Sequence, residues 1–373
     1  MIKYKKENNP YTLQFSYIPP QFIERRVMTA DIVDNFTRQL PTYRGMFITG
    51  VRGSGKTVMM GDIRNKIAGI KDKKGNKAWV TVDLNAETNL IDSLARGLYR
   101  IPELKTLFLE AKLDFSFLGI GVKIENAHVI ASNEEDAIII MLEALKKANK
   151  KVLVTIDEVT YNENIAKLSH ALSSFANQDL DIYLLMTGLA DNIKKIKNNP
   201  SLTFLYRAKE INLEPLNITA IRSNYQEKCG LSMENAEKFA VMTKGYSLAF
   251  QTLGFYIWDE LSISGNTNDI EIESIYAKLD DTLAEFSYDK IFSELSEGDI
   301  KVLQAMAEIE AETGETLIKA DSIYEKIGKG HDDYTKYRSR LIGSGIVDGS
   351  QRGRLRFILP RMRQYIENRR DEY

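Results

Sequence analysis

Residues 50–57 read GVRGSGKT and fit the pattern G-x-x-x-x-G-K-[ST]. Glycines let a chain turn sharply, so that its backbone N–H groups can surround a phosphate. The lysine of this pattern reaches the β- and γ-phosphates of a nucleotide, and the final hydroxyl ligates Mg²⁺. We therefore predict a nucleotide phosphate site with Lys56 and Thr57 as its side chains. Further contacts are expected from Val51, Arg52, Gly53, Ser54, Gly55 and Val58.

Hydrolysis of a nucleotide also requires a carboxylate for the metal and a base for water. The stretch VLVTIDEV ends an apolar run with two adjacent acids, Asp157 and Glu158, about 100 residues after the glycine loop. We predict that Asp157 holds Mg²⁺ through its water molecules and that Glu158 polarises the attacking water. The alternative is an ordinary solvated strand end.

Two more polar residues next to apolar segments could take part in the reaction. Thr187 ends the apolar run in LLMTGL and is expected between the two carboxylates and the γ-phosphate. Arg207, in FLYRAKEI, is a candidate for the cation that offsets charge on the transferred phosphoryl group. If so, it is expected to point at the nucleotide of a neighbouring subunit. The alternatives are that Thr187 only ends a strand and that Arg207 is an ordinary surface residue.

The elements that must position these residues follow from the pattern of apolar runs. Strands are predicted at 46–50, 77–84, 151–159, 181–188 and 208–216, with helical patterns between them. One expected helix precedes the first strand, with Val27, Ile32, Phe36 and Leu40 as its apolar positions. Strands that alternate with helices form a parallel sheet with both faces covered. A hairpin is also expected over 113–125.

The pattern changes after Pro215, where three helices with glycine stops follow without a strand between them. From Ser296, three helices and then two short strands around a glycine-flanked turn predict a winged helix-turn-helix. We therefore expect an α/β nucleotide-binding domain with a five-stranded parallel sheet and an N-terminal arm at 1–215. A helical lid at 216–290 and a winged helix at 291–373 are expected to follow.

Residues 336–370 contain ten lysines and arginines but only two acids, a net charge of +8. Such a cluster on a third helix and wing is the pattern expected for phosphate contacts with double-stranded DNA. The candidate DNA contacts are Lys336, Arg338, Arg352, Arg354 and Arg356. A contact with protein, such as the acidic lid, is the alternative.

Composition excludes several other classes of protein. The chain has 373 residues, 43% of them hydrophobic, and a net charge of −2, so the whole protein shows no general basicity. Cys229 is its one cysteine, which rules out an internal disulfide and fits a reducing compartment. The longest apolar run, 137–142, is too short to cross a membrane. We therefore expect a cytoplasmic protein without a membrane partner.

Taken in order, these motifs resemble the AAA+ P-loop ATPases, and most of all the origin-recognition or initiator ATPases and the prokaryotic STAND-like ATPases. The resemblance implies ATP or ADP as ligand, Mg²⁺, and adenine contacts from Ile23 and Arg25. The segment 244–254 is similar to the family's lid motif, with Ser247 where proline is common and without the usual lid arginine.

Three functions remain open on the sequence. The first is an ATP hydrolase, with turnover that could be slow, which acts as a nucleotide-controlled, initiator-like DNA-binding protein. The second is a STAND-like signalling switch that holds ADP, hydrolyses slowly and contacts protein through its winged helix. The third is a small-molecule phosphotransferase, which the lid and winged helix disfavour. Self-association or a partner protein could complete the ATP site in the first two.

Overall fold

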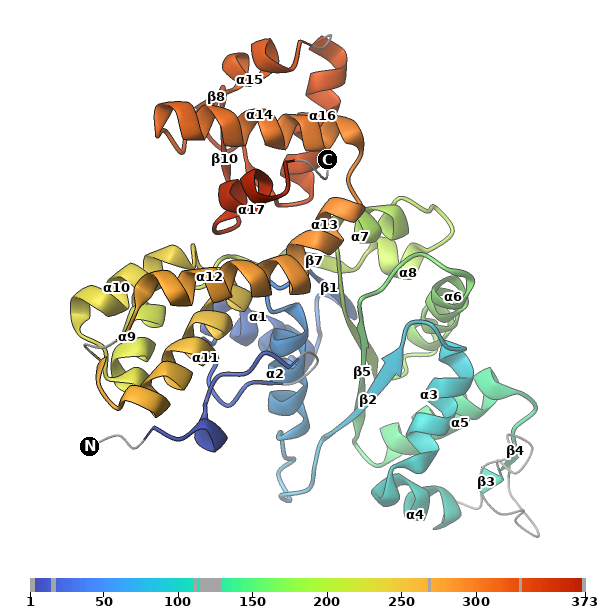
Figure 1. Cartoon of the computed structure of the whole chain (residues 1–373). Coiled ribbons are helices and arrows are strands. Elements are labelled where there is room, and N and C mark those ends of the chain that lie inside the picture. The colour runs from blue at the N-terminus through green and yellow to red at the C-terminus, as the bar shows by residue number, and fades with distance from the viewer. Residues whose placement is uncertain are drawn as a thin grey trace. The chain divides into compact units, whose positions relative to one another are not determined.

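The computed structural model describes residues 4–14, 18–110, 113–114, 129–267, 270–328 and 331–370. The chain divides into two compact units (Figure 1). The sheet unit comprises residues 25–49 and 56–212. The helical unit comprises residues 1–24, 50–55 and 213–373. The sequence pattern GVRGSGKT is thus shared between the two, with the glycine loop in one and Lys56 and Thr57 in the other.

The sheet unit contains five parallel strands in the order β2–β5–β6–β1–β7. Their bounds are β1 (Gly45–Thr49), β2 (Trp79–Asn85), β5 (Lys151–Asp157), β6 (Ile182–Gly188) and β7 (Lys209–Asn212). Every residue of β1 and β6 is buried, as expected for strands covered on both faces. All five predicted strands are therefore confirmed, and the sheet is parallel as predicted.

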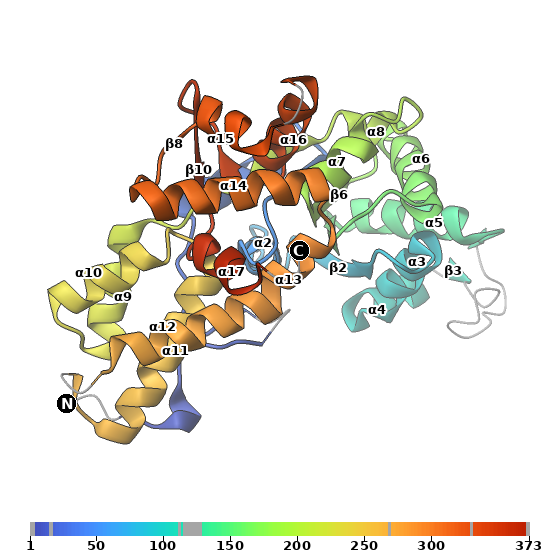
Figure 2. The same cartoon turned by 45° about the horizontal axis from the view of Figure 1, so that its top comes forward.

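Helices cover both faces of this sheet (Figure 2). Helices α1 (Arg26–Thr37) and α2 (Lys56–Ala68) pack together on one face. The other face is covered by α3 (Leu90–Arg100), α5 (Glu134–Lys147) and α6 (Glu163–Asn177). Shorter helices are α4 (Pro102–Glu110), α7 (Ala190–Lys197) and α8 (Thr203–Tyr206). The sequence sets the starts of α3, α5 and α6, because an asparagine side chain caps each of them.

Two details of the sequence interpretation need correction or fall outside the described residues. Ile32 and Phe36 of α1 are buried, but Val27 is 75% exposed and Leu40 is 87% exposed. Val27 lies five residues before Ile32 and so on another side of the helix, while Leu40 lies beyond its end. The hairpin expected at 113–125 lies mostly outside the described residues; β3 (Leu113–Asp114) pairs in parallel with β4 (Val129–Ile130).

In the helical unit, the segment predicted as a lid, and called the lid below, contains α9 (Ile218–Cys229), α10 (Met233–Met242), α11 (Ser247–Ser264) and α12 (Ile272–Leu283). A π-helical segment, Ala284–Tyr288, leads from α12 into α13 (Asp289–Ser293). The arm, with a 3-10 turn at Lys6–Asn8, packs on the lid through Tyr11, which is 1% exposed. A Cβ atom at Gly254 would lie 2.4 Å from the Tyr11 ring, so glycine there makes room for this contact.

The C-terminal module begins with α14 (Glu297–Thr313), α15 (Ala320–Ile327) and α16 (His331–Gly343). Strands β8 (Ile318–Lys319), β9 (Val347–Asp348) and β10 (Arg354–Phe357) form an antiparallel sheet in the order β8–β10–β9, and α17 (Met362–Asn368) follows. Three helices followed by a hairpin is the order of elements that the sequence predicted for a winged helix. Strand β8 and helix α17 are additions to it. The three-domain division itself stays a prediction.

Arg340 of this module holds the start of α14. Ser296 and Asp299 form a capping box there, and the Arg340 guanidinium donates to both Asp299 oxygens and to Ser296 Oγ. The Asp299 side chain is 4% exposed, whereas that of Arg340 is 52% exposed. This cation therefore has a structural partner inside the module.

Asp299→Ala is expected to destabilise the module by about 2–3 kcal/mol, because it removes a helix cap and the partner of a half-exposed arginine. Differential scanning calorimetry measures the change. Asp321→Ala, an exposed acid in the first turn of α15, is the matched control and should cost about 0.5 kcal/mol or less. Equal losses in the two variants would contradict the assigned role of Asp299.

Among the described residues, no helix is long and apolar enough to cross a membrane.

Candidate functional site

In the sheet unit, Asp157 stands at the end of β5 and accepts two hydroxyl groups. Thr57 Oγ1 donates to Asp157 Oδ2 at 2.7 Å, and Thr187 Oγ1 donates to Asp157 Oδ1. Thr187 is completely buried near the end of the adjacent strand β6, and Lys56, the first residue of α2, is only 8% exposed. The structure therefore brings together three of the predicted side chains: Thr57, Asp157 and Thr187.

Glu158 follows directly and has an unusual backbone conformation. Its φ is +51°, in the left-handed region that residues other than glycine rarely adopt. Its N–H lies 3.1 Å from both Thr187 Oγ1 and Asp157 Oδ1, and Val159 N–H donates to the Thr187 carbonyl at 2.8 Å. Such strain persists only where surrounding contacts enforce it. Thr187 therefore fixes the position of the Glu158 backbone beside Asp157.

In the helical unit, three consecutive lid residues hold three consecutive carbonyls of the glycine loop. Tyr246 Oη donates to the Arg52 carbonyl at 2.5 Å. Leu248 N–H donates to the Gly53 carbonyl at 3.1 Å, and Ser247 Oγ donates to the Ser54 carbonyl at 2.8 Å. Burial raises the pKa of the Tyr246 phenol, so this hydroxyl stays protonated and can donate.

These contacts determine where the loop N–H groups point. A trans peptide directs its N–H opposite to its C=O, so the N–H groups of Gly53 and Gly55 point away from the lid residues that hold Arg52 and Ser54. Neither N–H donates to a protein group within the described part of the chain. Gly53 and Gly55 have φ values of +74° and +91°, which glycine tolerates best. A backbone loop whose carbonyls are bonded on one side, and whose N–H groups are available on the other, is suited to bind an anion.

The loop also approaches the C-terminal module, and its partner Tyr246 contacts the π-helical segment. A Cβ atom at Gly345 would lie 2.9 Å from Val51 Cγ1, which shows how closely α16's following turn approaches the loop. Ser287, in the π-helical segment, has its Oγ 2.8 Å from Tyr246 Oη. Sequence reasoning missed these contacts, because they join segments that are far apart in the sequence.

Gly53→Ala should weaken ATP binding at least tenfold (~1.4 kcal/mol). The new Cβ would lie 2.2 Å from Tyr246 Oη in a left-handed residue, so the loop must shift. Gly75→Ala is the matched control, since Gly75 has a φ of +83° but no atom within 4 Å of the added Cβ. Titration calorimetry should show unchanged ATP affinity for Gly75→Ala. If both variants lost ATP affinity to a similar extent, general backbone strain and not the contact with Tyr246 would be the cause.

The remaining predicted site residues lie elsewhere. Ile23 is half-buried against the core of the helical unit, whereas Arg25 precedes α1 in the sheet unit. Arg207 is exposed at the end of α8, and no acid pairs with it among the described side chains. The roles of Ile23, Arg25 and Arg207 therefore stay predictions.

Most of the basic side chains at 336–370 have a partner within the helical unit. Acidic partners or backbone carbonyls in the described residues engage these cations: Lys336 with Asp333, Arg340 with Asp299, Arg354 with the Leu317 carbonyl, Arg356 with Asp348, Arg361 with Asp280, Arg363 with Glu310, Arg369 with Asp289 and Arg370 with Glu308. Arg338 is half-buried and Arg352 is exposed. The charge of +8 counted along the sequence therefore overstates the cations available to phosphates.

Comparison with known proteins agrees with this fold. The ORC2 protein of Aeropyrum pernix, solved as ADPNP–ADP complexes, superposes with a TM-score of 0.62 at 14% identity, over 95% of this chain and 96% of that one. A Walker-type ATPase of Pyrococcus abyssi superposes with a TM-score of 0.61 at 14% identity, over 93% and 96%.

Residues 286–366 match a domain family described only as a domain of unknown function (DUF8462). No curated protein matches the sequence. At these identities the structural likeness establishes the fold alone. The chain therefore shares the overall fold of these two proteins, with a five-stranded parallel sheet and a small C-terminal antiparallel sheet.

Proposed function

We propose that the chain binds ATP at residues 50–57 and hydrolyses it in a Mg²⁺-dependent reaction. The observation that carries this proposal is the cluster of Thr57, Asp157, Thr187 and Glu158, which lies at the carboxyl ends of adjacent parallel strands. Ligands of open α/β sheets bind at this edge. The A. pernix protein of the same fold was solved with ADPNP and ADP.

The residues present fit a magnesium ion. Thr57 Oγ1 and Asp157 Oδ2 are hard oxygen donors 2.7 Å apart, and Mg²⁺ in nucleotide sites takes few protein ligands besides phosphates and water. A bound Mg²⁺ would supply charge neutralisation at the phosphates. Lys56 would hold the β- and γ-phosphates, and the N–H groups of Gly53 and Gly55 would cradle them.

For the chemical step, Glu158 is the general base that orients and deprotonates the attacking water. Thr187 positions Glu158, because the Thr187 hydroxyl accepts a hydrogen bond from the Glu158 N–H and donates one to Asp157. The same hydroxyl would report the state of the γ-phosphate to this pair. Hydrolysis should therefore require Mg²⁺, and EDTA should abolish phosphate release in a malachite green assay; release that persists in EDTA would count against the proposal.

Arg207 is proposed as the cation that completes the site of a second copy of the chain. Arg207→Ala should lower ATP turnover about 10³-fold or more, as loss of an arginine finger does. ATP affinity should stay unchanged, because Arg207 would act only on the transition state.

A mixing experiment tests whether Arg207 acts between copies. Equimolar Arg207→Ala and Lys56→Ala chains are each inactive alone, but a mixed interface would pair an intact Arg207 with an intact loop. Recovery of up to roughly a quarter of wild-type turnover, the statistical share of such interfaces, is expected. No recovery, despite co-assembly by light scattering, would exclude action between copies.

We also propose that the nucleotide controls binding of double-stranded DNA by the C-terminal module, as in an initiator-like protein. Arg352 is exposed at the wing and is the cation best placed for this role, with Arg338, Lys336, Arg354 and Arg356 as weaker candidates because of their internal contacts or burial. Salt-dependent binding of duplex DNA in the presence of ATP would support it. No binding at low salt would refute it.

The second candidate is a switch that retains ADP and turns over slowly. It is favoured by the lid contacts of Tyr246, Ser247 and Leu248, which hold the glycine loop through carbonyls and supply no arginine to the γ-phosphate. ADP that co-purifies with the protein, together with negligible steady-state turnover, would favour the switch. Rapid multiple turnover would favour the initiator-like ATPase.

A further inference from the structure

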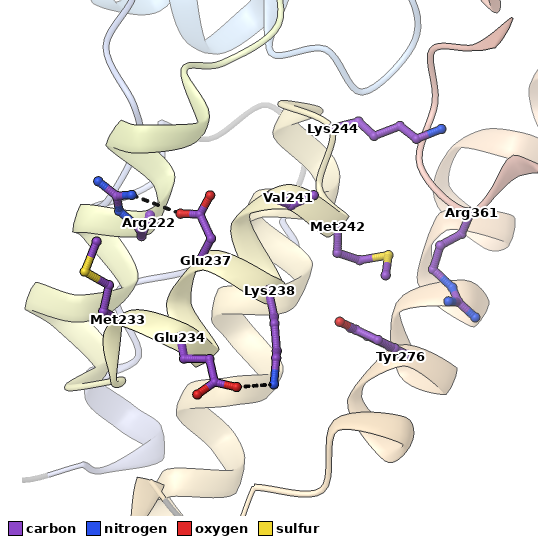
Figure 3. A pocket seen from close by; sticks show the side chains of 10 residues that line it. All are labelled: Arg222, Met233, Glu234, Glu237, Lys238, Val241, Met242, Lys244, Tyr276 and Arg361. Atoms are coloured by element: carbon purple, nitrogen blue, oxygen red, sulfur yellow. Dashed lines mark hydrogen bonds and ion pairs between the residues drawn. The ribbon is translucent and has the colours of Figure 1, made fainter. Parts of the chain in front are cut away.

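The helical unit contains a pocket whose lining residues are remote in sequence from the glycine loop. It has a volume of about 950 Å³ and lies between α9, α10, α12 and the segment at Arg361 (Figure 3). This is within the size range of small-molecule sites. Its apolar lining comes from Met233, Val241, Met242 and Tyr276.

Two of these apolar side chains are unusually accessible. Met233 is 60% exposed and Val241 is 55% exposed, although both belong to α10, whose other face forms the lid core. Apolar side chains that line a pocket and stay accessible to solvent mark it as a candidate binding site. Methionine adapts readily to the shape of an apolar ligand.

The charged side chains of the pocket are paired, with one exception. Arg222 Nη1 bonds Glu237 at 3.1 Å and Lys238 Nζ bonds Glu234 at 2.8 Å, as Figure 3 shows. Arg361 pairs with Asp280 of α12. Both pocket carboxylates are thus neutralised by neighbouring cations.

Lys244 is the exception. Its Nζ donates to the carbonyls of Phe357 at 3.1 Å and Leu359 at 3.4 Å, and it forms no ion pair with any described carboxylate. An ammonium has three N–H donors, so one remains for a ligand. The side chain lines the pocket, and burial lowers the pKa of its ammonium group, an effect that the Glu310 carboxylate partly offsets.

We propose that this pocket binds a small apolar molecule that ends in a carboxylate. Its apolar body would lie against Met233, Val241 and Tyr276, and its carboxylate would accept the remaining N–H of Lys244. The charge of the lining favours an anion, because Lys244 is the lining cation without an ion pair to a described carboxylate. The site is separate from the proposed nucleotide site and does not depend on ATP hydrolysis.

Decanoate and decan-1-ol test the proposal, since they share an apolar chain and differ in charge. Titration calorimetry on the full chain should show one decanoate site per chain, with decanoate bound at least ~10-fold more tightly than decanol. Lys244→Gln should bring the affinity for decanoate close to that for decanol. Val241→Asp should weaken binding of both at least ~10-fold.

The matched control is Ile263→Asp, which places the same charge on an exposed apolar residue of α11 that does not line the pocket. It should leave both affinities unchanged. Unchanged ATP binding in all variants confirms that they fold. Equal binding of decanoate and decanol by the wild type, an effect of Ile263→Asp equal to that of Val241→Asp, or no decanoate binding would each overturn the proposal. Absence of decanoate binding is the result expected if a protein segment occupies the pocket.

Discussion

Replacement of Lys56 by alanine is expected to abolish ATP binding under conditions where the wild type is saturated. Lys56 is the first residue of α2 and directly follows the glycine loop, and its side chain is almost completely buried. A charge-assisted hydrogen bond contributes about 1.5–3 kcal/mol, so contacts with two phosphates predict a loss of about 100-fold or more in affinity.

Titration calorimetry with ATP and Mg²⁺ measures this loss, and Lys66→Ala serves as the matched control. Lys66 belongs to the same helix, but its side chain is 40% exposed and pairs with Asp62 one turn earlier. The control should bind ATP like the wild type. If Lys56→Ala also retained wild-type affinity, the glycine loop would not be the nucleotide site.

Glu158→Gln is expected to block hydrolysis while ATP binding persists. Glutamine keeps the size and shape of the side chain and leaves the hydrogen bonds of the residue's N–H, which hold its left-handed backbone, unchanged. It cannot accept a proton from water, and loss of a general base typically lowers the rate about 10²–10⁴-fold. ATP affinity should change by less than about threefold, because the base acts in the transition state.

The control for this variant is Glu163→Gln, an exposed acid in the first turn of α6, which should hydrolyse ATP at the wild-type rate. Steady-state phosphate release measures the effect on the rate of hydrolysis, and ATP titration measures the effect on affinity. A Glu158→Gln variant that hydrolyses ATP normally would assign the base to another residue. One that fails to bind ATP would indicate a structural role at the end of β5.

The sequence predicted the strands and the phosphate motif because both are local. An apolar run bounded by glycine or polar residues is enough to locate β1, β5 and β6, and the loop motif has a fixed spacing. The roles of Asp157 and Thr187 could be suggested because parallel strands end at a common edge. Their hydrogen bond joins residues 30 positions apart, and the structure was needed to show it.

Contacts between distant segments were beyond sequence reasoning. Tyr246 and Arg52 are separated by 194 positions, and no local pattern indicates that a lid tyrosine ties a loop carbonyl. The acidic partners of the basic stretch could not be foreseen for the same reason, because Asp280 and Asp289 come from the lid and the segment after it. Charge counted along a sequence omits the neutralisation that folding produces.

Single-turnover hydrolysis of γ-labelled ATP, with enzyme in excess, tests the central claim most directly. The wild type should release labelled phosphate with Mg²⁺ and none in EDTA. Glu158→Gln should retain bound, uncleaved ATP, and Lys56→Ala should bind none. Equal rates of phosphate release by the wild type and Glu158→Gln, or release without Mg²⁺, would contradict the assignment of a Mg²⁺-dependent ATPase site to this edge of the sheet.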